Sequence, residues 1–440
     1  MPVSTVTLFC FLLFSNGLLA PTPPMGWNSW DSYGTTVREN QVKANADVMA
    51  AKLAKYGWKY VVVDIQWYEP NAQGHEYKSG AKLSIDAYGR LTPAVNRFPS
   101  AAGDKGFTPL ADYVHGKGLK FGIHIMRGVP RQAVNGNTPI FGSDHRAAEI
   151  ADREHVCSWN PDMYGVDMSK PGAQQYYDSI ASLYASWGVD FIKADDMSRP
   201  YDQRRPEVMA LSEAIRKTGR PIVLSLSPGP APVSAAGDLE QHAQMWRISD
   251  DFWDDWKLLK QQFNYTRDWA PYIGVKGTWP DADMLPLGKL RVTDQEKGPQ
   301  DSKFTQDEQR TVMTLWSIFR SPLIMGGDLP TSDSATFFLL TNPEVIRVNQ
   351  HSTDNHQTFD RKGIRAWVAR AADSDTHYVA VFNLADEGQQ LERKWPDVGI
   401  SYPIAKVTDL WERRELGSRR TLNISLSPHA SALYEVSAAK

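Results

Sequence analysis

Charged and hydroxyl-bearing side chains follow one apolar segment after another in this sequence, and their types could do chemistry. Each apolar segment is long enough for a buried strand, so these polar residues mark strand ends. Two carboxylates beside tryptophans are typical of glycoside hydrolysis, in which one carboxylate attacks the anomeric carbon and the other protonates the leaving oxygen. The strand-end residues are Trp30, Asp64, His124, Lys193, Asp195, Asp196, Ser227, Arg247, Asp250, Asp251, Asp281 and Asp283.

Other chemistries and plainer roles fit these residues less well. They do not form the tight ligand set of a zinc site, and they show no Ser-His-Asp pattern. A single strand-end aspartate often only caps the next helix, Lys193 can form a plain ion pair with Asp195, and the acidic run 249–256 can be a solvated helix start. Polar residues at several separate strand ends are harder to explain in these ways. We expect no metal and no cofactor.

Apolar segments and helix-length segments alternate over most of the chain, which predicts the frame that positions these residues. Continuous apolar strands separated by helices are typical of a parallel sheet with both faces covered. Eight such units favour a (β/α)8 TIM barrel, whose strands carry the active site at their carboxyl ends. An open doubly wound sheet is the alternative, but no glycine-rich phosphate loop supports it. The expected strands are 24–30, 60–64, 119–125, 189–195, 221–227, 243–249, 271–275 and 321–327, and helices are expected at 42–57, 171–188 and 307–320.

From residue 351 the pattern changes to short alternating strands with polar turns between them. The runs GIRAWVARA, HYVAVFNLA, YPIAKVTDLW and LNISLSPHASALYEV carry this pattern. It predicts a small antiparallel β-sandwich. The expected division of the chain is a signal peptide at 1–20, a catalytic barrel at 21–350 and a C-terminal sandwich at 351–440.

The N-terminal residues have the pattern of a secretory signal. The apolar run 8–14 is too short to span a membrane, and Ala20 offers a small residue for cleavage. Of the two cysteines, Cys10 and Cys157, only the second would remain in the mature protein, without a disulfide partner. We therefore expect a secreted or periplasmic protein that is not attached to a membrane. The net charge of −3 argues against a nucleic-acid partner.

Six motifs in the same order resemble those of glycoside hydrolase family 27, which comprises α-galactosidases and α-N-acetylgalactosaminidases. The resemblance runs from about residue 22 to the end of the chain and includes the closing sandwich. Each motif alone is modest, but the ordered set is specific. The motifs are PPMGWNSWDSYG (23–34), FIKADD (191–196), WRISDDFWDDW (246–256), WPDADML (279–285), LWSIFRSPLIMGGDL (315–329) and VIRVNQ (345–350).

The resemblance implies a retaining mechanism with a covalent glycosyl-enzyme. The family nucleophile is the aspartate of a Lys-x-Asp motif, which corresponds to Asp195 after Lys193. The family acid/base is the aspartate four residues after an arginine, which corresponds to Asp251 after Arg247, with Asp250 as the rival. In retaining enzymes the two carboxyl groups stand ~5–5.5 Å apart.

The resemblance also implies substrate contacts. Trp30 would wall the pocket, Lys193 would donate to sugar hydroxyls, and Arg247 would bind near the 2- and 3-hydroxyls. Asp64 matches the first acid of an Asp-Asp pair on the second strand, and Asp283 matches the aspartate of a D-x-D-M motif. The expected partner is a terminal galactose or arabinopyranose unit of an oligosaccharide or polysaccharide.

The chain departs from the family pattern at several positions. Gln66 and Met197 stand where members with the D-D-C-W and K-Y-D-N-C patterns carry cysteines. Ser227 ends the fifth strand, where the family usually has an acid or a serine before Trp-Pro. A serine there is similar to the N-acetylgalactosaminidase side of the family, in which a small residue makes room for a 2-acetamido group.

Ile65 is the departure that bears most on the substrate. The family's second acid at this position helps to hold the 6-hydroxyl and the axial 4-hydroxyl of galactose. A buried hydroxyl facing an isoleucine would lose its partner, at a cost of ~1–3 kcal/mol. The same apolar surface would tolerate β-L-arabinopyranose, which has the ring configuration of galactose without carbon six. Gln66 or a loop is the alternative partner for the 6-hydroxyl.

The expected function is a retaining, exo-acting hydrolase of the α-galactosidase type with additional β-L-arabinopyranosidase activity. The alternatives are β-L-arabinopyranosidase as the main activity, and α-N-acetylgalactosaminidase. A catalytically inactive sugar-binding protein is an alternative of a different class. It predicts the loss of one carboxylate, whereas Asp195 and Asp251 are both present. No feature of the sequence indicates an oligomeric state.

Overall fold

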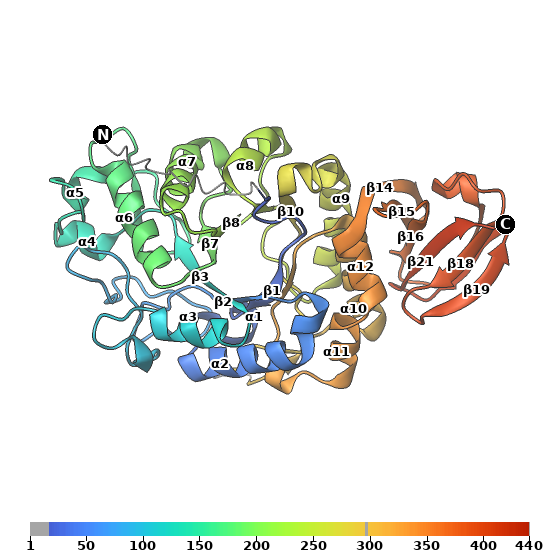
Figure 1. Ribbon diagram of the computed structural model, residues 1–440, viewed down its shortest axis with the longest axis horizontal. Coiled ribbons are helices and arrows are strands. Elements are labelled where there is room, and N and C mark those ends of the chain that lie inside the picture. Colours follow the sequence, from blue (N-terminus) through green and yellow to red (C-terminus); the bar gives the residue numbers. More distant parts are fainter. Residues whose placement is uncertain (1–16, 295–297, 440) are drawn as a thin grey trace, which may run out of the picture.

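A computed structural model describes residues 17–294 and 298–439, so most of the expected signal peptide lies outside the described residues. A curled parallel sheet surrounded by helices forms one part of the molecule, and an antiparallel sandwich lies at the other end (Figure 1). In the described ranges, no helix is both long and apolar enough to cross a bilayer.

The parallel sheet is the expected (β/α)8 barrel. Its strands follow the order β10-β9-β8-β7-β3-β2-β1-β13. A parallel bridge between Leu285, which follows β10, and Met325 of β13 joins the two edges. The strands are β1 (Met25–Asn28), β2 (Tyr60–Val63), β3 (Lys120–Met126), β7 (Phe191–Asp195), β8 (Val223–Leu226), β9 (Met245–Arg247), β10 (Trp279–Asp281) and β13 (Leu323–Met325).

Strand β2 shows why these strands read as continuous apolar runs. Tyr60 and Val62 pack in a cluster with Phe191 of β7, whereas Val61 and Val63 pack in the larger core that includes the surrounding helices. Successive side chains of a strand point to opposite faces, and both faces of this sheet are covered. The residue that follows at the same parity as Tyr60 and Val62 is Asp64, so the inner face of β2 ends in a carboxylate.

The helices cover the outside of the barrel (Figure 1). The expected helices at 171–188 and 307–320 are present as α6 and α10, and the one at 42–57 ends earlier as α2, followed by a π-helical turn at Met49–Leu53. The helices are α1 (Trp30–Tyr33), α2 (Glu39–Val48), α3 (Thr108–His115), α4 (Arg131–Asn135), α5 (Ala147–Ile150), α6 (Ala173–Ser186), α7 (Tyr201–Lys217), α8 (Ala236–His242), α9 (Trp256–Trp269), α10 (Gln306–Phe319), α11 (Ser334–Leu340) and α12 (Pro343–His351).

One expected strand, 271–275, is wrong. This segment forms parts of two 3₁₀ turns, Ala270–Tyr272 and Val275–Gly277, and the strand follows them as β10. Pro271 is the second residue of the first turn, and Gly274 adopts a φ of +72°, which a strand does not contain. The apolar composition of the segment was therefore outweighed by its backbone preferences.

The loops at the carboxyl side of the barrel contain short strands. Three of them form one small sheet after β3, and two pair after β10. Because these loops follow the carboxyl ends of the strands, they lie where a barrel enzyme builds its substrate pocket. These strands are β4 (Val129–Pro130), β5 (Ala151–Asp152), β6 (Met163–Val166), β11 (Lys289–Leu290) and β12 (Gln300–Asp301).

The C-terminal part is the expected antiparallel sandwich. One sheet has the order β14-β15-β16-β21-β18-β19, and β17 pairs with β20. The run LNISLSPHASALYEV forms two strands rather than one, because Pro428 and the left-handed His429 interrupt it. The strands are β14 (Ser352–Arg361), β15 (Ile364–Ala371), β16 (His377–Asn383), β17 (Gln389–Lys394), β18 (Ala405–Asp409), β19 (Arg414–Arg419), β20 (Thr421–Leu426) and β21 (Ser431–Ala438).

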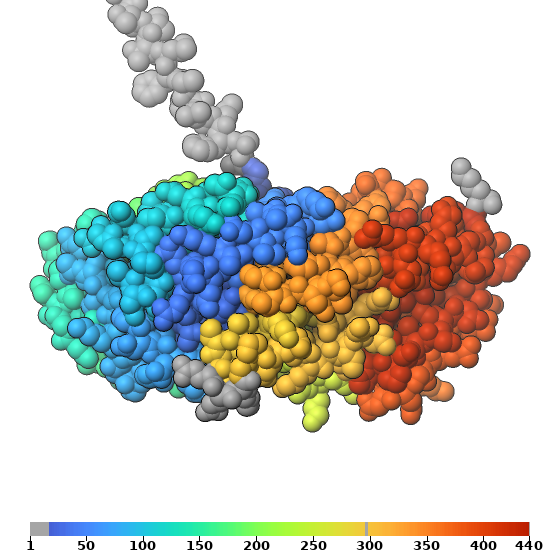
Figure 2. Space-filling model, turned by 90° about the horizontal axis from the view of Figure 1, so that it is seen from below, coloured from blue at the N-terminus to red at the C-terminus, as the bar shows by residue number. Residues whose placement is uncertain are grey.

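The sandwich packs directly on the last helices of the barrel, as Figure 2 shows where red meets orange and yellow. The His429 ring stacks on Trp256 at a centroid distance of 3.8 Å, and its Nδ1 lies 2.6 Å from the Glu308 carboxylate. Asn342 donates to the carbonyl of Leu410 across the same interface. Apolar side chains of both parts also share one buried core, so polar, aromatic and apolar contacts together join the barrel and the sandwich.

Candidate active site

Strand alternation brings most of the expected residues to the inside of the barrel. Phe191 lies inside the barrel, so Lys193 and Asp195 of the same strand also face inward. The same parity places Asp64 after β2, His124 in β3, Ser227 after β8 and Arg247 in β9 on the inner face. Parallel strands end at one rim, so these side chains converge at the carboxyl end of the barrel.

A pocket of about 350 Å³ opens at this rim. It includes four of the expected substrate-binding residues and both expected catalytic aspartates. Its lining also includes aromatic and charged residues from the loops. The lining residues are Trp30, Asp64, Ile65, His75, Tyr77, Trp159, Lys193, Asp195, Arg199, Pro228, Asp250 and Asp251.

Asp195 lies deep in this pocket and is held by hydrogen bonds to both of its carboxylate oxygens. His124 Nε2 lies 3.0 Å from Oδ2, and Ser227 Oγ donates to Oδ1 at 2.7 Å. Burial would raise the pKa of Asp195, but His124, the nearby Lys193 and Ser227 together hold that pKa well below its usual value. The carboxylate is therefore ionised, as the expected role of nucleophile requires.

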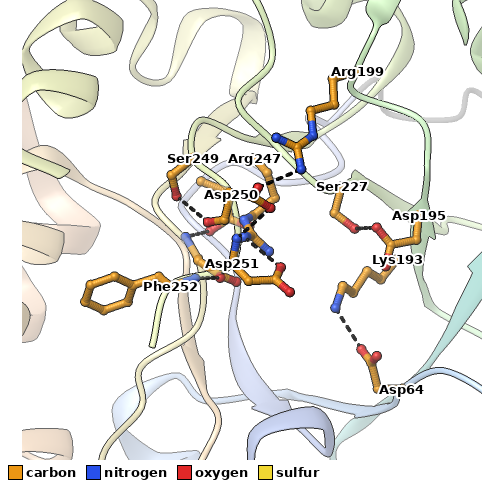
Figure 3. Close-up of polar contacts among 12 residues, drawn as sticks. Asp64, Lys193, Asp195, Arg199, Ser227, Arg247, Ser249, Asp250, Asp251 and Phe252 are labelled. Atoms are coloured by element: carbon orange, nitrogen blue, oxygen red, sulfur yellow. Dashed lines mark hydrogen bonds and ion pairs between the residues drawn. The ribbon is translucent and has the colours of Figure 1, made fainter. Parts of the chain in front are cut away.

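Lys193 and Asp64 form a buried ion pair across the pocket floor (Figure 3). Lys193 Nζ lies 2.9 Å from Asp64 Oδ2, which also accepts from Asn28 Nδ2 at 2.7 Å. The Ile65 backbone N–H donates to the other oxygen. Burial opposes ionisation of Asp64, yet Lys193 and these donors keep its pKa below the usual value. The pair thus presents an ammonium group and a carboxylate to a polyhydroxy ligand.

Ile65 is buried and lines the pocket beside Asp64. Gln66 does not take over the polar role at this position. Its backbone has a φ of +61°, its side chain is fully buried, and its Nε2 donates to Asp162 at 2.9 Å. The wall of the pocket next to Asp64 is therefore apolar.

Arg247 organises the carboxylates on the other side of the barrel. Its Nη2 lies 2.7 Å from Asp283 Oδ2 and 3.3 Å from Asp251 Oδ1. Asp283 also accepts from the Phe252 backbone N–H. Burial, which outweighs the effect of Arg247, raises the pKa of Asp283 to about 7 and that of Asp281 to about 6.

Three expected binding residues lie beneath the open pocket. Ser227, Arg247 and Asp283 line a small inner cavity of the barrel, which Lys193 shares with the pocket. Ser227 is fully buried and is committed to Asp195. Its small side chain therefore does not open space in the pocket lining for a 2-acetamido group. Asp283 contacts Arg247 rather than the open pocket.

The adjacent aspartates Asp250 and Asp251 point in different directions (Figure 3). Asp250 Oδ2 pairs with Arg199 Nη2 at 2.7 Å near the pocket mouth, while Asp251 points toward Lys193 and Asp195. Both carboxylates are open to solvent, with side-chain exposures of 61% and 54%. The orientation of Asp251 favours it over Asp250 as the proton donor.

Asp196 and Met197 turn away from the pocket. Asp196 adopts a φ of +58° and pairs with Arg127 Nε at 2.8 Å and with Arg204 at 3.4 Å. Met197 is fully buried, and the cysteine in the described residues, Cys157, is a free thiol. A buried ion-pair network on Asp196 thus directly follows the Lys-x-Asp strand, and Met197, at the position of the family cysteine, packs in the core without a disulfide.

One side of the pocket is an aromatic wall, of which only Trp30 was expected from the sequence. Tyr77 stacks parallel to Trp30 at a centroid distance of 6.4 Å, and Trp159 leans against Tyr77 at 5.6 Å. His75 packs edge-on against Trp30, and burial lowers the pKa of this histidine to about 4. Three of these four residues lie in loops without regular periodicity, so no sequence signal placed them here. Aromatic faces of this kind bind the C–H faces of sugars.

The arrangement therefore defines a class of protein. A (β/α)8 barrel that presents an ionised buried aspartate, a second aspartate at the mouth and an aromatic wall is a glycoside hydrolase. In the described part of the chain, no group of three or more His, Cys, Asp and Glu side chains is placed to hold a metal ion.

Comparisons with known proteins agree with the class of glycoside hydrolases and identify one family within it. The family model described as alpha galactosidase A matches residues 22–170 and 163–351, and the model of its C-terminal β-sandwich domain matches 361–436. Alpha-galactosidase 2 of Arabidopsis thaliana is 28% identical over 98% of this chain and 92% of its own length. The chain belongs to glycoside hydrolase family 27, the α-galactosidase family.

Two solved structures of family relatives are more similar in sequence. A family 27 β-L-arabinopyranosidase from Geobacillus stearothermophilus is 50% identical, with a TM-score of 0.92, covering 96% of this chain and 97% of the other. A putative α-N-acetylgalactosaminidase from Bacillus halodurans is 47% identical, with a TM-score of 0.85, covering 95% and 98%.

Proposed function

We propose that this protein is a retaining exo-glycosidase that removes terminal β-L-arabinopyranosyl units and accepts α-D-galactosyl units less well. The single observation that carries this substrate choice is the apolar Ile65 wall beside Asp64, with Gln66 turned away from the pocket. The likeness to the arabinopyranosidase from Geobacillus stearothermophilus supports the same choice. The general α-galactosidase activity that the motifs predict is the second candidate.

The physical reason for this substrate preference is the environment of the 6-hydroxyl group of galactose. A galactoside would place its 6-hydroxyl against an apolar surface, and a buried hydroxyl without a partner costs ~1–3 kcal/mol. An arabinopyranoside has the same ring configuration and no carbon six, so it avoids this cost. The expected discrimination is roughly 5- to 150-fold in kcat/KM, since 1.4 kcal/mol corresponds to a factor of ten.

We propose Asp195 as the nucleophile and Asp251 as the acid/base. In the first step an Asp195 oxygen bonds to the anomeric carbon, the bond to the leaving oxygen breaks, and the Asp251 proton passes to that oxygen. In the second step Asp251 takes a proton from water, the water oxygen bonds to the anomeric carbon, and Asp195 is released as a carboxylate. The two displacements together retain the configuration of the sugar.

The substrate choice is tested with three 4-nitrophenyl glycosides: the β-L-arabinopyranoside, the α-D-galactopyranoside and the N-acetyl-α-D-galactosaminide. We expect the arabinoside to give the highest kcat/KM. Ile65→Asp restores an acceptor and should move the ratio toward the galactoside by about tenfold or more. Ile65→Val keeps the wall apolar and is the matched control. A hundredfold preference for the galactoside that Ile65→Asp leaves unchanged would overturn the proposal.

The catalytic roles are tested separately from the substrate. A 2-deoxy-2-fluoro glycoside with a good leaving group should trap a covalent adduct, which peptide mass spectrometry should locate on Asp195. An adduct on another residue would refute the assignment. No adduct together with no turnover of any of the three glycosides would instead support the inactive sugar-binding protein.

We also propose that the protein is exported. The support is the apolar N-terminal run 8–14, which is too short to span a membrane. Ala20 is buried, and its carbonyl accepts from Trp279 Nε1 at 2.9 Å, so cleavage directly after Ala20 would remove this bond. N-terminal sequencing of the protein recovered from its native host tests the proposal, and an intact Met1 would contradict it.

A further inference from the structure

The depths of the two catalytic aspartates define an axis through the pocket. The Asp195 side chain is 13% exposed and is anchored among buried groups, whereas the Asp251 side chain is 54% exposed at the mouth. In the proposed mechanism the bond that breaks lies between them, and Asp251 protonates the leaving oxygen. The released part of the substrate must therefore lie on the outer side of the pocket, next to Asp251.

The Arg199–Asp250 ion pair occupies this outer side (Figure 3). Arg199 follows β7 four residues after Asp195, and Asp250 directly precedes Asp251. Arg199 Nη2 lies 2.7 Å from Asp250 Oδ2, and the other carboxylate oxygen, Oδ1, accepts from the Asp251 backbone N–H at 3.0 Å. Both groups are thus fixed beside the proton donor while 41% of the Arg199 side chain and 61% of the Asp250 side chain stay open.

Trp159 supplies an apolar surface in the same pocket. It is half-buried and leans on Tyr77, which itself stacks on Trp30. The aromatic wall therefore continues beyond the residue expected to pack on the first sugar. The pocket volume of about 350 Å³ lies in the range of sites that hold a drug-sized ligand, which is larger than one pentopyranose ring.

The charges indicate what kind of group fits. Arg199 and Asp250 cancel each other, so the pair offers hydrogen-bond donors and acceptors without a net charge. A lone arginine at this place would favour a carboxylate-bearing ligand such as a uronic acid. The neutral pair suits hydroxyl groups, and the indole face of Trp159 in the same pocket suits the C–H face of a sugar ring.

We propose that the Arg199–Asp250 ion pair and Trp159 form a leaving-group subsite that binds an uncharged second sugar residue of the substrate. This proposal rests on the assignment of Asp251 as the acid/base. It deepens the proposed function by naming the chemistry of the released part: a neutral sugar, joined through the oxygen that Asp251 protonates. Asp250 then serves to hold Arg199 rather than to transfer a proton.

The test compares substrates that differ only in the released group. The glycosyl unit is arabinopyranose or galactose, whichever the wild type hydrolyses better, so a wrong substrate preference does not affect this test. The released group is fluoride, which makes no contacts in the subsite, a neutral hexose, or a hexuronic acid. We expect the wild type to hydrolyse the neutral disaccharide with at least a tenfold higher kcat/KM than the uronic acid disaccharide.

Variants of the pair should change this pattern in a specific way. Arg199→Ala should lower kcat/KM for the neutral disaccharide by about tenfold or more, with a loss on the fluoride that is at least fivefold smaller. Trp159→Ala should act in the same direction. Arg199→Gln keeps hydrogen-bond donors and should recover part of the loss. Arg205→Ala, which removes another exposed Arg–Asp ion pair on α7 with Asp238, is the matched control and should have no effect.

Two results would overturn the subsite. One is an Arg199→Ala loss of equal size on the disaccharide and the fluoride, because that pattern indicates a role in the common chemistry or in folding. The other is a wild type that prefers the uronic acid disaccharide. If Asp250→Asn, rather than Asp251→Asn, abolishes activity on the disaccharide and is rescued by azide, the acid/base assignment itself fails, and the subsite fails with it.

Discussion

The two aspartates proposed to do the chemistry lie in opposite surroundings. Asp195 is deep in the barrel, with His124 on one carboxylate oxygen, Ser227 on the other and Lys193 close by. Asp251 stands at the solvent-facing mouth, and its side-chain contact is Arg247 Nη2 at 3.3 Å. One carboxylate is surrounded by donors, and the other is nearly free.

The difference explains how two identical side chains can have different roles. Dense hydrogen bonding keeps Asp195 ionised and fixes its position, which suits a group that must attack one carbon atom. A loosely held carboxyl at the mouth can exchange its proton with solvent and with the leaving oxygen in turn. In this proposal the environment rather than the residue type separates the two roles, as is general for paired catalytic carboxylates.

Removing the deep carboxylate should have the largest effect. Asp195→Ala should lower kcat by roughly 10⁴-fold or more on every glycoside, because no covalent intermediate can form. Steady-state rates on the best 4-nitrophenyl glycoside measure this. Circular dichroism should show a folded protein. Activity within a hundredfold of wild type would contradict the role of Asp195 as the nucleophile.

Removing the outer carboxyl should have an effect that depends on the leaving group. Asp251→Ala should cost ~10²–10⁴-fold on a disaccharide, which needs a proton on its leaving oxygen, and much less on a glycosyl fluoride. Azide should restore turnover and give a glycosyl azide of retained configuration, detectable by NMR. The same loss on both substrates, with no azide rescue, would contradict the proposed role.

Removing the His124 hydrogen bond to Asp195 should leave this carboxylate with fewer donors, as Asp251 has. His124→Phe removes a donor that holds the pKa of Asp195 down, so the acidic limb of the kcat/KM profile should move to higher pH. His124→Gln keeps a donor and should restore most of the limb. The fold-change in kcat should exceed that in KM, because the hydrogen bond acts on the nucleophile. An unshifted acidic limb would show that His124 is only a packing residue.

The features predicted from the sequence are those fixed by periodicity. Strand parity determines that Asp64, Lys193, Asp195 and Arg247 face the barrel axis, so their convergence followed from the pattern. The predictions of the barrel and the sandwich, which also rested on periodicity, are confirmed. The expected strand at 271–275 failed because apolar composition does not reveal the turns that a proline and a left-handed glycine impose.

The outer half of the pocket could not be predicted in this way. Tyr77 and Trp159 reach it from loops, whose paths depend on tertiary packing rather than on a repeating pattern. The sequence also left Asp250 and Asp251 as rivals, since neither is held in a strand. The different orientations of their side chains depend on Arg199, which lies 51 positions before Asp250 in the sequence and forms an ion pair with it.

A last and smaller effect concerns stability, and it extends the comparison to a third carboxylate. Asp283 is buried like Asp195, but burial outweighs its partner Arg247 and raises its pKa to about 7. Between about pH 4 and 7 the folded state therefore holds a proton that the unfolded state has lost, so this group's contribution to stability falls as the pH rises through that range. For Asp195, whose pKa is lowered, the contribution is lost as the pH falls instead.

Asp283→Asn should remove this loss, so the free energy of unfolding should decline less between pH 4.5 and 7.5 in the variant than in the wild type. The expected difference in that decline is on the order of 1–3 kcal/mol, because one pKa unit corresponds to about 1.4 kcal/mol. The ion pair with Arg247 offsets part of the burial penalty on the Asp283 carboxylate. Urea unfolding at several pH values measures this difference. Asp195→Asn is the matched control, since its deviation from wild type should depend on pH mainly below about pH 4. Parallel curves for wild type and Asp283→Asn from pH 4.5 to 7.5 would show that Arg247 keeps Asp283 ionised as firmly as the donors around Asp195 keep that residue ionised.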